Sequence, residues 1–536
     1  MHRVLWLRAE AWILAALVLS LNACTSPREY VHNGFKVGPN ACVPAACAAP
    51  QWIDAADVRV RDDWTELGQW WSVFQDPTLD RLIAEASSQN LSLREAGFRV
   101  LEARGQLGIA SGNLFPQTQE AFGYYQRGAA SQVSNDSPGV GSQFFDQWAL
   151  GFNLSWELDF WGRFRRAVAA AEYTLEASSA NYDHVLVTLL GDVAANYAQL
   201  CTLQQRIHYL RANVELQERV LNVADRRLKA GGAGPLDSHQ ARSNLAQIQS
   251  QIPQLQLAMR QAGNRLCVLL GRPPADLENE FRPGAVPQVP ETVAIGIPAD
   301  LLRRRPDVRR AEREAAAQGQ QIGIAEADLY PMFAINGTIG YQAENASQLF
   351  TSPALTGAVG PIFEWKILNY GRIRNNMQVQ DARFWALVSA YQEAVLRANA
   401  EVEDGLAMFL RAQERTKLLG DSVNSTQQAV QIITREYQGG AADFNRVAVI
   451  QQDLVQQQDM LAQSQGEIVQ GLIQVYRALG GGWEFCPLPL ESSPEVPAPE
   501  GAAATPLPAP QPAPPSAGPG AESAVAAPAA PTPGEN

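Results

Sequence analysis

The side chains of this 536-residue chain offer little material for catalysis or metal binding. Its five histidines are isolated from one another and from the cysteines; they are His2, His32, His184, His208 and His239. Neither a Cys-x-x-Cys pair nor a glycine-rich nucleotide loop nor a nucleophile elbow occurs in the sequence. We therefore predict no catalytic residue, no metal site and no cofactor, and we do not expect an enzyme.

The first of the six cysteines has the context of a modification site. Arg3 and Arg8 precede an apolar run of about 11 residues, which suits the h-region of a secretion signal and is too short to span a bilayer. The run ends in Leu-Asn-Ala-Cys24, which resembles the bacterial lipobox, and that resemblance implies cleavage before Cys24 and a lipid on its thiol. Thr25 and Ser26 follow, without the aspartate that retains lipoproteins at the inner membrane, so the implied address is the outer membrane. An ordinary signal peptide with a coincidental cysteine is the alternative.

The remaining cysteines have no histidine nearby at metal-ligand spacing. Cys42 and Cys47 lie in a Pro/Ala-rich exported stretch. The sequence leaves open whether they form a small disulfide loop or remain two free thiols. Cys201 and Cys267 fall in helical apolar patterns, and we predict that both are buried.

Charge and composition limit the partners. The chain has 42 Lys and Arg against 55 Asp and Glu, a net charge of −13 that repels phosphate backbones and argues against nucleic acid. Residues 487–536 are rich in Pro and Ala and contain no Lys or Arg, so they cannot bury a core. We predict a disordered tail whose removal leaves assembly intact.

An internal duplication is the most informative feature of the sequence. Residues 158–163 (LDFWGR) match 367–372 (ILNYGR) at an offset of 209 residues. The same offset relates Leu228 to Tyr437, Gly231 to Gly440, and Leu270-Gly271 to Leu479-Gly480. Upstream an offset of 215 relates Leu93, Ala96, Ile109, Phe115 and Pro116 to Val308, Ala311, Ile324, Tyr330 and Pro331. The difference of six residues lies between the proline and the Gly-Arg pair, so we predict a longer loop in the first copy.

Each copy is predicted to begin with a helix and a hairpin. A helical stretch ended by a proline covers 91–114 in the first copy and 307–329 in the second. Segments of period-two apolar alternation follow at 117–125, 144–156, 333–341 and 355–363, the first of them weaker than the others. Each copy thus offers two strands of about ten residues, the length that crosses an outer membrane at a tilt.

Two helical segments are far longer than those of globular proteins. Residues 163–230 and 372–438 contain no proline, and each predicts a helix about 100 Å long at 1.5 Å per residue. The glycine-bearing turns and returning helices that follow are 230–237 and 236–270 in the first copy, 438–445 and 443–479 in the second. Each copy therefore ends in an antiparallel coiled-coil hairpin.

The predicted strands cannot close a barrel within one chain. Two hairpins give four strands, and an open sheet in lipid leaves unpaired edge groups that cost several kcal/mol each. Two copies would give eight strands and three would give twelve, and an eight-stranded barrel is filled by its own side chains. We therefore predict a fold that is mainly α with a membrane β-barrel, closing as a trimer whose helices continue the strands as a periplasmic tunnel.

Two further motifs carry a resemblance to a known family. Two segments resemble those of the outer-membrane factors of tripartite efflux and type I secretion systems, and more closely the lipoprotein branch of the RND-type efflux channels. The segment similar to the family's inter-repeat motif is Ile297-Pro-Ala-Asp-Leu-Leu-Arg-Arg-Arg-Pro-Asp-Val308. The segment similar to its opening motif is Trp70-Trp71-x-x-Phe74-x-Asp76-Pro77-x-Leu79. The resemblance covers about residues 60–485. It implies a homotrimer with a twelve-stranded barrel, a twelve-helix tunnel and an equatorial belt.

The same resemblance implies the function and the partners. The chain would be a passive exit duct for small molecules, served by a periplasmic adaptor protein and an inner-membrane pump. A lipid-anchored coiled-coil spacer or adhesin stalk without transport is the alternative. The expected organisation is a signal peptide at 1–23, a lipid-anchored linker at 24–60, a first repeat at 61–271, an equatorial segment at 272–300, a second repeat at 301–486 and the tail at 487–536.

The resemblance also places candidate working residues. At the periplasmic gate the family has two carboxylates, and Arg446 and Val449 stand at those positions here. Asp443 and Asp453 lie roughly on the same helical face, where threefold symmetry would form a charged ring. The alternative is that both are solvated surface aspartates and that Asp443 is an N-cap.

The turns are where the resemblance puts adaptor contacts, and the candidate residues are Gly231, Gly232, Gly439 and Gly440. They also serve as helix C-caps, because the reversal needs a positive φ. At the junctions of strands and helices, we predict that Trp156 belongs to an aromatic girdle at the membrane interface and that Trp161 and Tyr370 are packed.

Overall fold

The computed structural model describes residues 25–40, 45, 49–61, 67–129, 144–276, 286–296 and 304–485. These residues belong to one compact unit that extends to Leu488. The predicted signal peptide, the predicted tail and four of the cysteines, Cys24, Cys42, Cys47 and Cys486, lie outside the described residues.

The duplication is confirmed element by element. The first copy consists of α4 (Leu91–Gly112), β2 (Thr118–Ala129), β3 (Phe144–Leu158), α5 (Arg163–Lys229) and α6 (Pro235–Leu269). The second consists of α8 (Pro306–Ala327), β5 (Met332–Ala343), β6 (Leu355–Glu364), α9 (Arg372–Gln438) and α10 (Phe444–Ala478). Both long helices have 67 residues and both returning helices have 35.

The loop between the two strands is longer in the first copy, as predicted: residues 130–143 (14 residues) connect β2 to β3, and residues 344–354 (11 residues) connect β5 to β6. Strand β3 has 15 residues whereas its counterpart β6 has 10. The three residues by which β3 outlasts β6 at its C-terminal end are matched by a shorter stretch before α5, so they add nothing to the length of the first copy.

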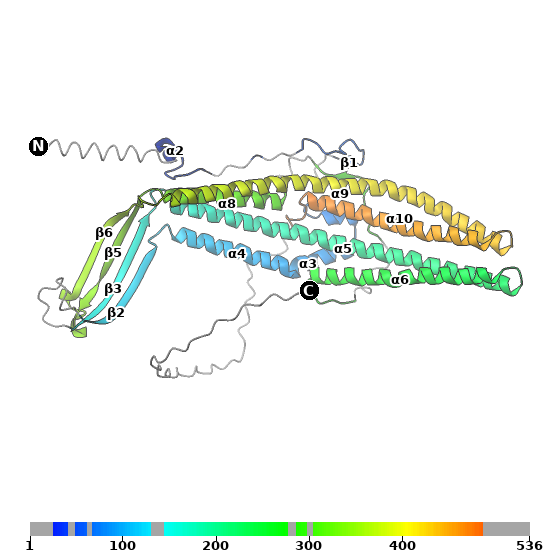
Figure 1. The fold of residues 1–536 in the computed structure, drawn as a ribbon, viewed down its shortest axis with the longest axis horizontal. Helices are drawn as coiled ribbons and strands as arrows, with labels where there is room; N and C mark the ends of the chain where they lie inside the picture. Colours follow the sequence, from blue (N-terminus) through cyan, green and yellow to red (C-terminus); the bar gives the residue numbers. More distant parts are fainter. Residues whose placement is uncertain are drawn as a thin grey trace, which may run out of the picture. The chain divides into compact units, whose positions relative to one another are not determined.

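The four long strands form one antiparallel sheet of order β2-β3-β5-β6 at one end of the helices (Figure 1). The register places Phe152 opposite Ile339 and Leu150 opposite Tyr341, so the alternating apolar positions of different strands share one face. The other face is more polar, and on it the Ser155 hydroxyl donates to the Asn336 side-chain oxygen at 2.8 Å. An apolar face opposite a more polar face is typical of a sheet that has lipid on one side and water on the other.

The helices form a layer that continues the sheet. Helix α5 packs against α4, α6, α8 and α10, and α9 packs against α8 and α10. Figure 1 shows α4 with α6 and α8 with α10 following one another along the layer, with α9 at its edge. Cys201 and Cys267 are free and buried, as predicted. Helix α5 is long and apolar enough to cross a membrane, but 61% of its most apolar window is buried inside the chain.

Short elements wrap the middle of the layer. They are β1 (Val60–Arg61), η1 (Trp70–Phe74), α3 (Pro77–Gln89) and β4 (Val293–Ala294), and β1 pairs with β4 in parallel. Trp70 is buried and stacks on Tyr476 of α10, while Trp71 meets Phe485 edge to face. N-terminal, inter-repeat and C-terminal segments thus pack together, as the equatorial belt of the resemblance implies.

Candidate functional site

The two turns at the tip of the helical layer have the same backbone. Gly231 and Gly440 have φ of +76° and +81°, a conformation that favours glycine. After α5, the Gly231 and Gly232 amides donate to the carbonyls of Leu228 and Arg227, and after α9 the Gly440 amide donates to Tyr437. These bonds form the Schellman cap of a helix end. The candidate glycines Gly231, Gly232, Gly439 and Gly440 are all exposed, which leaves the tip open to contact.

The four gate candidates lie on one exposed face at the start of α10. Asp443 is the N-cap residue of α10, although its side chain makes no capping hydrogen bond. Arg446, Val449 and Asp453 are exposed as well, whereas the opposite face of the same turns is buried, as at Phe444. Arg446 and Asp443 stand three positions apart, but no ion pair joins them within the described chain.

A contact that the sequence did not indicate ties the two helical hairpins together at the tip. Arg227 near the end of α5 donates to the Tyr437 carbonyl oxygen of α9 at 2.6 Å, and its guanidinium lies 4.5 Å from the centre of the Tyr437 ring. The Tyr437 hydroxyl donates to the Asp237 carboxylate of α6 at 3.2 Å. Burial is the main cause that raises the pKa of Tyr437, to about 12, so the phenol stays a donor.

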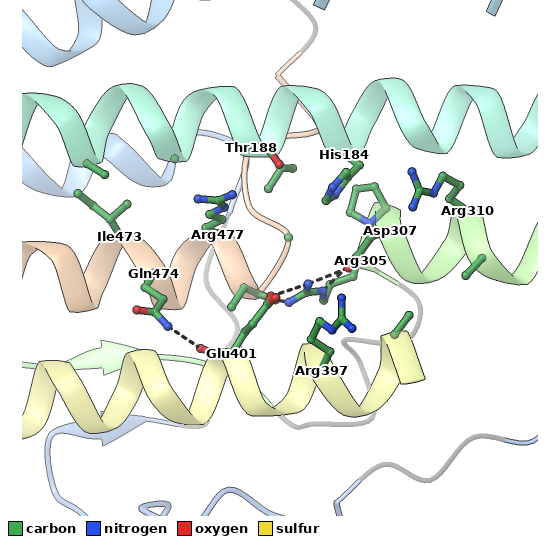
Figure 2. Close-up of a pocket in the computed structure, with 18 of the residues that line it drawn as sticks. His184, Thr188, Arg305, Asp307, Arg310, Arg397, Glu401, Ile473, Gln474 and Arg477 are labelled. Atoms are coloured by element: carbon green, nitrogen blue, oxygen red, sulfur yellow. Dashed lines mark hydrogen bonds and ion pairs between the residues drawn. The ribbon is translucent and has the colours of Figure 1, made fainter. Parts of the chain in front are cut away.

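Arg305 joins the end of α10 to the start of α8. It donates to the carbonyl of Ala478 at 2.8 Å and to the carboxylates of Asp307 and Glu401 at 2.8 and 2.7 Å. The joint borders a cavity of about 1030 Å³ between α5, α8, α9 and α10. Figure 2 shows Arg305 beneath α5, with Asp307 and Glu401 directed toward it. The first copy builds the same joint with an amide, because Asn90 donates to the Leu269 carbonyl at the end of α6.

The residues that follow Cys24 are held where the strands meet the helices. Helix α2 (Pro27–His32) begins this stretch, and the Tyr30 hydroxyl donates to the Phe160 carbonyl at 2.7 Å. Arg166 is fully buried, and its guanidinium donates to the carbonyls of Val37, Gly38 and Pro39. The Thr25 hydroxyl donates to buried Glu326 of α8. The part of the expected linker after Cys24 is therefore a docked segment.

The aromatic residues of the junctions differ in their surroundings. Trp161 stacks on Tyr330 with ring centroids 4.5 Å apart, so its predicted packing is confirmed. Tyr370 is 91% exposed, and the prediction that it packs is wrong within one chain. Trp156 is half-buried and donates from its ring nitrogen to the Leu114 carbonyl at 3.3 Å. That contact places Trp156 at the end of the sheet, where an interfacial girdle would stand.

The described residues offer no chemistry beyond these contacts. No group of three His, Cys, Asp or Glu side chains among them is placed to hold a metal ion. The arginines that line the cavity already have acidic or amide partners in the chain, as Arg310 does in Asn181 and Arg477 in Asp192. These contacts are suited to holding helices side by side and to joining their ends.

Comparison with known proteins gives consistent matches along the chain. The family model described as "Outer membrane efflux protein" matches residues 82–272 and 297–481. The pyoverdine export outer membrane protein OpmQ of Pseudomonas putida is 31% identical over 476 residues, 88% of this chain and 97% of that protein. The solvent efflux pump outer membrane protein SrpC of Pseudomonas putida is 28% identical over 459 residues, 84% of this chain and 96% of that protein. The outer-membrane channel OprN superposes with a TM-score of 0.79 at 30% identity, covering 84% of this chain and 99% of that structure.

Proposed function

This chain belongs to the outer membrane efflux protein family and is the outer-membrane channel of a tripartite efflux pump, and we propose that it works as a passive homotrimeric duct. It is a channel and not an enzyme. The spacer or adhesin alternative loses its support, because a stalk needs neither membrane strands nor this family relationship.

The proposal of a trimer rests on the open edges of the sheet. Among the described strands of one chain, β2 and β6 each pair on one side only, so two edges of the sheet have unpaired backbone groups. Such groups cost several kcal/mol each in lipid, which favours closure with other copies. Three copies give twelve strands and leave a lumen, whereas two would give a barrel filled by its side chains. The helical layer would close with the sheet into a twelve-helix tunnel.

A lipid on Cys24 would anchor this duct beside its own barrel. Thr25, the next residue, is bonded to Glu326 at the junction of sheet and helices, which supports an anchor at the periplasmic surface of the outer membrane. A single acyl signal holds a protein weakly, and the barrel would supply the second attachment. We place the adaptor at the exposed turns of the tip and an inner-membrane pump beyond it as the energy source.

The cargo is proposed only as a class, small molecules. The two relatives above are named for pyoverdine and for solvents, and a passive duct is consistent with either kind. At the closed tip, Arg446 of each copy would meet Asp443 of a neighbour, since no pair forms inside one chain. An unpaired ring of three like charges would be costly, so partial pairing of this kind would stabilise the resting state.

Reconstitution tests the duct directly. The purified full chain is expected to have the mass of a trimer by native mass spectrometry in detergent and to conduct ions in a planar bilayer. Addition of the same amount of heat-denatured protein is the control for leakage. A protein that is monomeric, or trimeric without any conductance after extended recording at both voltage polarities, would contradict the proposal.

A further inference from the structure

Three phenylalanine rings form a row on the apolar face of the sheet, at its end next to the helices. Phe333 is the second residue of β5 and Phe363 the last but one of β6, and their rings stack with centroids 6.2 Å apart. Phe160, two residues beyond the end of β3, meets Phe333 edge to face at 5.2 Å. Phe333 lies six residues before Ile339 on the same strand, so the row belongs to the face that we assign to lipid.

The docked N-terminal segment lies directly beside this row. The Tyr30 hydroxyl of α2 donates to the Phe160 carbonyl at 2.7 Å, and the Tyr30 ring lies 5.8 Å from the ring of Trp161. Farther along the segment, the Val37 amide donates to the Trp161 carbonyl at 3.0 Å. The path of residues 30–37 is therefore fixed to the end of β3 and the start of α5.

The turn that follows α2 has an unusual backbone. Phe35 has a φ of +60°, which a bulky residue rarely adopts. Its amide donates to the Tyr30 carbonyl at 2.8 Å. The Arg165 guanidinium donates to the carbonyls of Gly34 and Phe35 at 2.8 and 2.7 Å and forms an ion pair with Asp159 at 2.9 Å. These bonds hold a turn whose largest side chain, the Phe35 ring, remains 55% exposed.

We propose that this turn is a membrane-contact element, with Phe35 and neighbouring Val31 inserted into the surface of the outer membrane beside the sheet. Val31 is 59% exposed, so the segment adds two large apolar side chains next to exposed Phe160 of the row. Apolar side chains that adjoin a lipid-facing surface leave water by entering the boundary between headgroups and acyl chains. The contact rests on the position of the sheet in the outer membrane and needs no acyl chain on Cys24.

The position of the turn favours lipid over a second copy of the chain. The docked segment crosses α5 and α8, because Arg166 of α5 and Glu326 of α8 bind it. These two helices lie inside the layer, between α4 and α9 (Figure 1). Copies that pair at the outer strands β2 and β6 would approach along α4 and α9, away from the turn. The surface that the row and the turn share is the one toward lipid.

Fluorescence quenching measures where the turn lies in the full chain. In a background with Cys42, Cys47 and Cys486 replaced by Ser, the variant Phe35→Cys is labelled with the fluorophore NBD and reconstituted into phosphatidylcholine vesicles. A nitroxide near the headgroup end of the acyl chains should quench this label several-fold more strongly than aqueous iodide does. Val31→Cys should behave in the same way, so the result does not depend on one substitution in the turn.

Two labelled sites serve as matched controls. Phe363→Cys, in the row on the lipid-facing side, should be quenched by the lipid nitroxide. Val58→Cys should be quenched by iodide alone, because Val58 is 91% exposed beside β1 in the middle of the layer, far from the sheet. Both controls replace an exposed apolar side chain, as the two test variants do.

The outcomes separate this contact from the proposed function. If the labels at Phe35 and Val31 behave as the label at Val58 does, while the label at Phe363 is quenched by lipid, the membrane contact is overturned and the channel stays in the bilayer. Protection of the two labels from both quenchers means that protein covers the turn, which also overturns the contact. A label at Phe363 that lipid does not quench overturns the membrane position of the sheet, and the contact with it.

Discussion

Replacement of Arg227 by Ala should open the resting channel. The guanidinium connects the two helical hairpins through its bond to the Tyr437 carbonyl and its position over the Tyr437 ring. Opening of a tip in which these hairpins separate must break that contact. Its loss should therefore raise the population of open channels without changing the conductance of the open state.

The size of the effect follows from the contacts. A hydrogen bond to a charged donor contributes about 1.5 to 3 kcal/mol, and an exposed cation–π contact about 0.5 to 1 kcal/mol. Because Arg227 is half-buried, we take the low end, about 2 kcal/mol per chain. One broken contact would then shift the open-to-closed ratio about 25-fold, and three broken together about four decades.

Single-channel recording in planar bilayers measures that ratio. The control is Arg242→Ala, which removes the same charge near the tip but breaks only an exposed pair with Asp225, 3.5 Å away within the first hairpin. Arg242→Ala should leave the open probability close to that of the original protein. If Arg227→Ala changes the open probability less than about threefold, the contact with Tyr437 does not hold the channel closed.

Three further predictions concern the anchor, the gate face and a half-buried carboxyl. Cys24→Ser should abolish incorporation of labelled fatty acid, and an intact mass showing an unmodified Cys24 thiol in the original protein would contradict the lipid anchor. Arg446→Glu should raise the basal conductance or shift selectivity toward cations, and unchanged currents in both Arg446→Glu and Asp443→Ala would place these residues away from the pore. Burial raises the pKa of Asp183 to about 6, and the charge of Arg309 opposes this shift. The folded protein therefore binds this proton more tightly than the unfolded chain does. Its free energy of unfolding should fall as the pH rises from about 4 to about 6. Asp183→Asn should remove that part of the pH dependence of Tm, and parallel Tm curves for the two proteins between pH 4 and 7 would exclude it.

The sequence predicted the elements because each has a local cause. Proline and glycine mark many of their ends. Three glycines of the first copy have a positive φ at the same spacing as three glycines of the second; they are Gly162, Gly231 and Gly271, and Gly371, Gly440 and Gly480. The strand faces followed from a period of two, which the register of β3 and β5 confirms. The lengths of α5 and α9 followed from the absence of proline and the spacing of the duplication, whereas α6 continues through Pro253.

The joints could not be predicted in the same way. Arg227 and Tyr437 are 210 residues apart, and nothing local to either indicates the other. Arg166 reads as an ordinary helix-surface arginine until the backbone of Val37–Pro39 is seen around its guanidinium. Tyr370 was expected to pack, as Trp161 does, but it is exposed in the single chain. Contacts between distant segments and between copies leave no periodic signal in one sequence.

The distribution of buried side chains indicates which part of the layer can move at least cost. The main core runs through the middle of the layer, where the short wrapping elements add Trp70, Trp71 and Phe74 to the helix contacts. The tip has a separate cluster of eight buried residues around Tyr437 and Phe444. Regions with few buried apolar contacts open at lower free energy than the core that supports them. Separation of the hairpins at the tip would expose only this small cluster and break the Arg227 contact, while the core and the joint at Arg305 remain in place. An opening movement would therefore cost least at the tip, where the proposed adaptor would bind.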